Sequence, residues 1–164
     1  VGGNDTTRNS MSGYAYGLHS FQDEREKLEK NPAFITNAVS EIIRWQTPLA
    51  HMRRTATQDH DLFGAPIKAG DKIGMWYLSA NRDETVFENP DKLIVDRENA
   101  RRHLAFGYGI HRCVGARLAE LQIRILLEEM AARRLRPNVV AEPERVSGCF
   151  VHGYRKMDVE LSRY

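Results

Sequence analysis

The sequence predicts a mainly α-helical fold with small β-sheets. A long helical pattern covers residues 114–134, where apolar residues occupy most of the surface and charged residues of alternating sign form one stripe. A second helix is expected after Asn31-Pro32, because asparagine is a favoured N-cap and proline a favoured first helical residue. Between Arg53 and Tyr77 the pattern changes to short alternating segments with a turn signal at 69–71, which is typical of small strands.

Three helical segments are expected before Pro48. The first continues from the N-terminus through Met11, Tyr14, Ala15 and Leu18, and the second is a charge-rich stretch from Phe21 to Lys30. The third begins at Asn31-Pro32 and is expected in the core, because its apolar residues follow helical spacing. These residues are Phe34, Ile35, Ala38, Val39, Ile42 and Trp45.

Strands are expected in two regions. Around Thr55–Thr57 one strand follows Arg53 and Arg54, and another covers Lys72–Tyr77. Further strands are predicted at 139–140, 150–152 and 159–161, with a turn at 156–158. The helix over 114–134 lies between these regions, and its broad apolar surface predicts packing on several sides.

The composition is that of an ordinary globular domain. The chain has 164 residues, 41% hydrophobic and 28% charged, with a formal charge of +2, so the charge gives no reason to expect a nucleic-acid partner. No stretch resembles a signal peptide or reaches the roughly 20 apolar residues of a membrane span. Cys113 and Cys149 could form one disulfide, but we expect reduced thiols and a cytoplasmic protein.

The most informative stretch is Phe-Gly-Tyr-Gly-Ile-His-Arg-Cys-Val-Gly at 106–115. Glycines let the backbone come close to a flat ligand, and a cysteine at a helix N-terminus lies where a thiolate is favoured. The pattern therefore predicts a metal-thiolate loop. Its glycine spacing does not fit the dinucleotide-binding fingerprint. The alternative for Cys113 alone is a small buried apolar residue without chemistry.

This loop resembles the haem-binding signature of the cytochrome P450 family, with Phe106, Gly109, His111, Cys113 and Gly115 on signature positions. The resemblance implies haem b with an axial thiolate from Cys113. It also implies that His111 and an arginine before the first strand bind the two haem propionates. Arg54 fits that arginine position better than Arg53.

Two further segments match the family. The segment Gly2-Gly3-Asn4-Asp5-Thr6 resembles part of the long helix that crosses the haem, where Asp5 and Thr6 would relay protons to bound dioxygen; a plain helix N-cap is the alternative. Glu41 and Arg44, three residues apart on one helix face, resemble a structural ion pair that Arg97 would complete. By this resemblance residues 1–164 are the C-terminal part of a single P450 domain, with the N-terminal half absent.

The resemblance implies a monooxygenase that inserts one oxygen atom from O2 into an apolar substrate. The expected substrate contacts are Leu49, Ala50, Met52, Phe150 and Val151, and the motifs look like those of bacterial enzymes that hydroxylate the ends of alkanes and fatty acids. Ferredoxin and ferredoxin reductase would be the partners, with NAD(P)H acting only indirectly through them. A haem-thiolate sensor or electron-transfer protein, a peroxide-using relative and an inactive fragment remain as alternatives.

Overall fold

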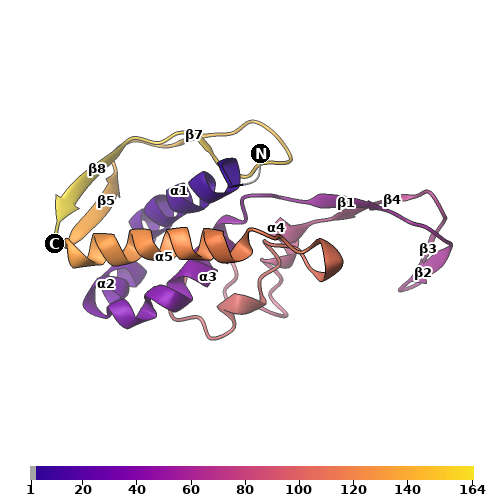
Figure 1. Cartoon of the computed structure of the whole chain (residues 1–164), viewed down its shortest axis with the longest axis horizontal. Helices are drawn as coiled ribbons and strands as arrows, with labels where there is room; N and C mark the ends of the chain where they lie inside the picture. The colour runs from indigo at the N-terminus through magenta and orange to yellow at the C-terminus, as the bar shows by residue number, and fades with distance from the viewer. Residues whose placement is uncertain (1–2) are drawn as a thin grey trace.

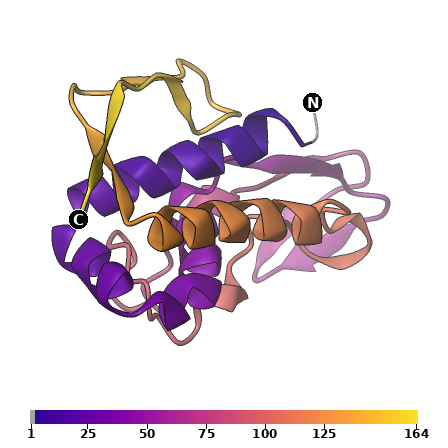
Figure 2. The ribbon, with the colours of Figure 1, turned by 60° about the vertical axis from the view of Figure 1, so that its left-hand side comes forward.

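Two long helices, α1 (Asp5–Ser20) and α5 (Ala116–Ala132), run side by side through the molecule (Figures 1 and 2). The computed structural model describes residues 3–164, so Gly2 of the expected glycine pair lies outside the described residues. α3 (Ile35–Gln46) packs against both long helices, and α2 (Gln22–Lys30) joins α1 to it through a short 3-10 helix at Pro32–Phe34. Within residues 3–164 we find no helix with the length and apolar character that crossing a membrane requires.

The strands form four small antiparallel pairs. β1 (Met52–Thr55) pairs with β4 (Lys72–Met75), and this ribbon extends away from the helices to a hairpin of β2 (His60–Leu62) and β3 (Ala65–Ile67) (Figure 1). The short helix α4 (Tyr77–Ala80) follows. Near the C-terminus β5 (Leu135–Val139) pairs with β8 (Val159–Arg163), and β6 (Glu144–Arg145) pairs with β7 (Tyr154–Lys156). The predicted fold class is confirmed.

α3 is the core helix that its sequence predicts. The Asn31 side-chain oxygen accepts a hydrogen bond from the Ala33 N–H at 3.2 Å, so Asn31 caps the short 3-10 helix that leads into α3, whereas α3 itself begins after Phe34 without a side-chain cap. Ala38 and Ile42 are fully buried at 0% exposure. They belong to one apolar cluster with Leu18 of α1 and Ile123 of α5, which fixes the angle between the long helices.

Three details of the predicted elements are wrong. Arg53 and Arg54 lie inside β1 instead of before it. Residues 150–152 are not a strand, because Val151 makes only a single bridge to Leu49 and regular pairing begins at Tyr154. α5 does not bury its apolar surface on several sides within the described part of the chain, where Leu118, Leu121 and Ile125 are 58%, 41% and 47% exposed.

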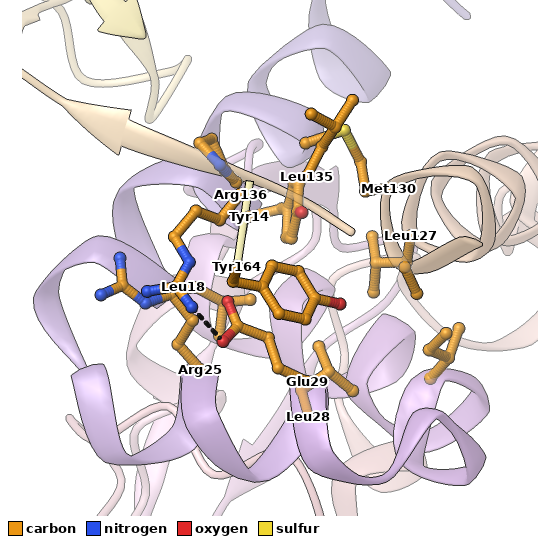
Figure 3. A pocket seen from close by; sticks show the side chains of 13 residues that line it. Tyr14, Leu18, Arg25, Leu28, Glu29, Leu127, Met130, Leu135, Arg136 and Tyr164 are labelled. Atoms are coloured by element: carbon orange, nitrogen blue, oxygen red, sulfur yellow. Dashed lines mark hydrogen bonds and ion pairs between the residues drawn. The ribbon is translucent and has the colours of Figure 1, made fainter. Parts of the chain in front are cut away.

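The C-terminal residue closes the junction of α1, α2, α5 and β5 (Figure 3). The carbonyl of Tyr164 accepts a hydrogen bond from Arg134 Nε at 2.6 Å, and its ring lies 5.0 Å from the guanidinium carbon of Arg136. Arg136 in turn pairs with Glu29 of α2 at 2.8 Å, the interaction dashed in Figure 3. A cavity of about 30 Å³ remains beneath the ring, so the packing at this end is nearly complete.

A buried ion network joins α3 to the irregular segment that follows α4. The Glu41 carboxylate receives Arg44 Nε at 2.7 Å and Arg97 Nε at 3.0 Å, and the three side chains are 0%, 0% and 5% exposed. Arg44 also donates to the backbone carbonyls of Asn81, Pro90 and Lys92. The predicted pair and its third member Arg97 are therefore in contact, and the network is hydrogen-bonded as a buried charge must be.

Glu41→Ala or Arg44→Ala should lower the free energy of unfolding by about 3–5 kcal/mol, because each leaves a buried charge without its partner. Lys30→Ala is the control, since the Lys30–Glu26 pair is exposed and such pairs contribute about 0–1 kcal/mol. Urea unfolding measures both effects. A Glu41→Ala protein that unfolds at the wild-type urea concentration would contradict the prediction.

Candidate functional site

The helices α1 and α5 begin at the same end of the molecule in both views (Figures 1 and 2). A cleft of about 450 Å³ is lined by residues from the first turns of both helices. Its walls come from the first turns of α1, from the chain leading into β1, and from the loop that precedes α5. Eight residues chosen from the sequence line this one cleft. They are Thr6, Leu49, Met52, Arg54, Phe106, His111, Cys113 and Gly115.

The loop before α5 is folded tightly by its own backbone. Gly107 and Gly109 have φ values of +69° and +76°, a region that side chains with a Cβ seldom adopt. The Cys113 N–H donates to the Phe106 carbonyl at 2.9 Å, and the Ala116 N–H donates to the Cys113 carbonyl at 3.3 Å where α5 begins. Cys113 is thus an exposed free thiol at the N-terminal end of a long helix, where negative charge is favoured.

His103 supports the same loop from the other side. Its ring packs against Phe106 with the centroids 5.4 Å apart, and its Nδ1 accepts a hydrogen bond from the Ala105 N–H at 3.2 Å. Burial, together with the Arg112 charge, lowers the pKa of His103 to about 4. The imidazole is therefore neutral near pH 7, as its acceptor role requires.

The lining of the cleft fits a haem. Cys113 offers one sulfur atom, and a haem would need a cysteine from this chain as a ligand because the porphyrin supplies only its own nitrogen ligands to the iron. Val114 and Leu118 present apolar surface with exposed fractions of 103% and 58% beside the thiol, which suits a flat apolar ring. Arg54 and His111 add groups that can bind carboxylates at the edge of the cleft. Arg54, and not Arg53, is among the residues that line the cleft.

Gly115 lies beside the thiol. A Cβ at this position would have Cys113 Sγ as its neighbour at 3.9 Å, so a larger side chain at 115 would extend into the cleft next to the sulfur. The glycine therefore leaves the space next to the thiol open.

The predicted relay pair is divided. Thr6 lines the cleft, whereas Asp5 lies outside the described lining set and pairs with Arg8 at 3.4 Å on the exposed side of α1. The N-cap alternative is not seen either, because α1 begins at Asp5, Asn4 precedes it, and no described side chain caps its first turn. Gly3 lies in a turn with φ +83°, so it is not within a helix as the resemblance implied. Successive helical residues point in different directions, which explains why Asp5 and Thr6 separate.

The predicted substrate contacts are also divided. Leu49 and Met52 line the cleft, but Ala50, Phe150 and Val151 lie outside the described lining set. Ala50 is 6% exposed, and its N–H donates to the Phe150 carbonyl at 2.9 Å. Val151 bridges Leu49. The C-terminal turn therefore holds the 48–52 segment in place from behind.

Sequence reasoning missed several lining residues. Ser10 follows Thr6 by four positions, and Gln122 follows Leu118 by four, so helical spacing could have found both. Ser10 Oγ donates to the Thr6 carbonyl at 2.9 Å, which places it on the same face. Tyr77 carries no such signal, because it reaches the cleft only through the turn after β4.

Comparison with known proteins places this geometry in a family. The model of the family described as Cytochrome P450 matches residues 22–133. A linalool 8-monooxygenase of Pseudomonas putida is 40% identical over 98% of this chain and 39% of its own length, and a methyl-branched lipid omega-hydroxylase of Mycobacterium tuberculosis is 42% identical over 99% and 38%. The chain thus spans about two fifths of the length of these relatives.

Solved structures give the same result for the fold. CYP153D17 from Sphingomonas sp. PAMC 26605 superimposes with a TM-score of 0.97 at 74% identity, covering 99% of this chain and 41% of that one. Cytochrome P450-153 from Novosphingobium aromaticivorans gives 0.96 at 69% identity, with 99% and 41% covered.

Proposed function

The chain belongs to the cytochrome P450 family, and from this premise we propose that it forms the thiolate side of a haem monooxygenase acting on apolar substrates. The observation that carries the proposal is the convergence of Cys113, Arg54, His111 and Thr6 on one cleft. We also propose that residues 1–164 are the C-terminal part of a single P450 domain, since the relatives are longer and α5 has exposed apolar residues. The open reading frame upstream of Val1 tests that assignment.

In this proposal Cys113 would ligate the iron of haem b, and Arg54 and His111 would bind the propionates. Phe106 would contact the haem, and Gly115 leaves space beside the sulfur. When bound, thiolate-ligated haem supplies the activation of dioxygen that favours O–O cleavage. The task of the chain is then to hold the thiolate, exclude water with its apolar walls and position a proton donor.

Cys113→His tests the assignment in the full-length protein. The reduced wild-type protein with carbon monoxide should show the red-shifted Soret band of thiolate ligation, and the variant should move that band to the position of histidine ligation, because the donor atom changes from sulfur to nitrogen. Cys149→Ser is the matched control, since Cys149 is also an exposed free cysteine but lies away from the cleft. An unchanged Soret band in Cys113→His would contradict the proposal that Cys113 ligates the haem iron.

Thr6 is the proton-delivering residue that the geometry supports. Its side chain belongs to the cleft wall, and its carbonyl is held by Ser10 Oγ at 2.9 Å. A hydroxyl in that place can hold a water and pass a proton toward the reacting oxygen. Asp5 could take part in proton delivery only if its side chain turned away from Arg8, with which it pairs at 3.4 Å.

Thr6→Ala should therefore keep haem and substrate binding but reduce the amount of product formed per NAD(P)H consumed. The rate of product formation should fall by a factor of about 10². Asp5→Asn is the comparison, and a small effect is expected because its carboxylate pairs with Arg8. Product and cofactor consumption are measured together. If Thr6→Ala forms as much product per NAD(P)H consumed as the wild type, Thr6 has no role in proton delivery. If Asp5→Asn lowers this ratio as much as Thr6→Ala does, both residues deliver the proton.

We further propose that the substrates are alkanes or fatty acids, oxidised at or near the chain end. Leu49 and Met52 give the cleft an apolar wall next to Thr6, and the segment that carries them is fixed by backbone bonds to Phe150 and Val151. Ala50 is the buried support between them. The named activities of the relatives, on linalool and on methyl-branched lipids, belong to those proteins and are compatible with this class.

The affinity of the full-length enzyme should rise with substrate chain length until the cleft is full, since each buried methylene contributes about 0.8 kcal/mol. Substrate-induced spectral shifts give the dissociation constants, and product analysis gives the position of the hydroxyl group. Equal affinity across the series, or a preference for aromatic or steroid substrates, would overturn the substrate class and leave the haem-thiolate assignment standing. Absence of any oxygenated product would favour a sensor or electron-transfer protein.

Electrons would come from an acidic carrier protein, with ferredoxin and its reductase as the proposed partners and NAD(P)H acting through them. A groove of about 490 Å³ between α3 and α5 is lined by Arg101, Arg112, Arg117 and Arg124, together with Glu120, which pairs with Arg117 at 3.1 Å. Arg112 precedes Cys113 in the chain. Positive charge so close to the thiolate loop suits a negatively charged donor.

Reduction by ferredoxin should slow as ionic strength rises, because salt screens exposed charges. Arg101→Glu should slow it by about tenfold at low salt through the association rate. Arg163→Glu, which changes an exposed arginine on β8, is the matched control. Equal effects of the two substitutions in stopped-flow measurements would place the partner elsewhere.

A further inference from the structure

Asn81 connects three parts of the molecule from a fully buried position. Its exposed fraction is 0%, and it follows α4 directly. Its side-chain Nδ2 donates to Thr47 Oγ1 at 2.8 Å, and its Oδ1 accepts the Leu104 N–H at 2.6 Å. Its backbone carbonyl accepts Arg44 Nη1 at 2.6 Å. One residue thus joins the buried ion network, the end of α3 and the start of the cysteine loop.

A short series of backbone hydrogen bonds links Asn81 to the backbone of Cys113. Beyond the Leu104 N–H, the Leu104 carbonyl accepts the Gly107 N–H at 2.8 Å, and the Phe106 carbonyl accepts the Cys113 N–H at 2.9 Å. The other end of the loop continues into α5, whose Ile123 is fully buried in the core. The side chain of Asn81 therefore anchors one end of the loop and α5 anchors the other.

α4 supports the loop at a second point. The Asn81 N–H donates to the Tyr77 carbonyl at 2.9 Å, so the two residues belong to one turn. A Cβ at Gly107 would approach Tyr77 Oη to 3.0 Å, which shows that the tyrosine lies directly against the loop backbone. A shift of α4 would consequently be transmitted to Gly107 and to Leu104 together.

Thr47, the other partner of Asn81, has a conformation that needs support. Its φ is +40°, an unfavourable value for a β-branched residue, and it is fully buried at 0% exposure. Thr47 Oγ1 donates to the Arg44 carbonyl at 2.5 Å. The Asn81–Thr47 bond belongs to the end of α3, whereas the Asn81–Leu104 bond belongs to the loop, so the two can be removed separately.

We propose that Asn81 is a positioning residue for the Cys113 thiolate, acting through its hydrogen bond to the Leu104 N–H. The inference rests on the proposed function, in which Cys113 binds the haem iron. Without that bond the partly buried Leu104 N–H loses its partner, and residues 104–106 can move away from α4. The Phe106 carbonyl that holds the Cys113 N–H moves with them, and the Cys113 sulfur is then held less firmly in its place.

The test uses the full-length haem protein, reduced and saturated with carbon monoxide, and follows the half-life of the thiolate Soret band at a fixed mild temperature. Asn81→Ala should shorten that half-life by roughly tenfold, the effect of one buried group left unpaired. Thr47→Val removes the other bond of Asn81 and should change the half-life by less than about twofold.

Urea unfolding midpoints separate positioning from general stability, because Asn81→Ala and Thr47→Val each remove two side-chain hydrogen bonds and should lower the midpoint to a similar extent. If Thr47→Val shortens the half-life as much as Asn81→Ala, or if Asn81→Ala keeps the wild-type half-life, the positioning role is overturned. Should Asn81→Ala not accumulate with haem, Asn81→Ser takes its place, since the shorter side chain also withdraws the oxygen from Leu104. A wild-type protein without the thiolate band would instead overturn the proposed function.

Discussion

The buried carboxylate of Glu41 is the constraint on which much of this structure depends. A charge at 0% exposure must be paired and hydrogen-bonded, and here two arginines and the Ile94 N–H meet that need. The two arginines in turn donate hydrogen bonds to backbone carbonyls of the segment between α4 and Arg97. This segment has little regular secondary structure. Backbone groups that no helix or sheet satisfies are therefore satisfied by guanidinium groups, and an irregular segment becomes a fixed part of the core.

Two regions held by hydrogen bonds fix the walls of the cleft. On one side, Asn81 and Tyr77 connect the ion network to the cysteine loop. On the other side, the 48–52 segment is held by the C-terminal turn, where the His152 N–H donates to the Pro48 carbonyl at 3.0 Å and Gln46 Nε2 donates to the His152 carbonyl at 2.8 Å. The two walls of the cleft are thus fixed from behind, so that the apolar surface between them is left to face a ligand.

The sequence predicted those parts of the fold and site whose cause is local. The Asn31 cap, the apolar period of α3 and the glycine-rich approach to Cys113 all act within a few residues, and Glu41 and Arg44 share one helix face. The direction of Asp5 depends on where α1 begins, and the role of Val151 depends on a strand partner distant in sequence. Such features follow from tertiary contacts, which no local pattern specifies. Arg97 was found only because the family pattern supplied a long-range contact.

α5 shows how one helix can serve both the core and the site. Ile123 and Leu127 lie in the apolar cluster with α3, while Leu118, one turn closer to Cys113, faces the cleft. A helix transmits position along its axis with little loss, since the backbone groups between its ends are hydrogen-bonded within it. The location of the thiol is therefore set partly by packing more than two turns away from it. Residues that never touch the cleft, Ile123 and Asn81 among them, accordingly determine the geometry that a ligand of Cys113 would meet.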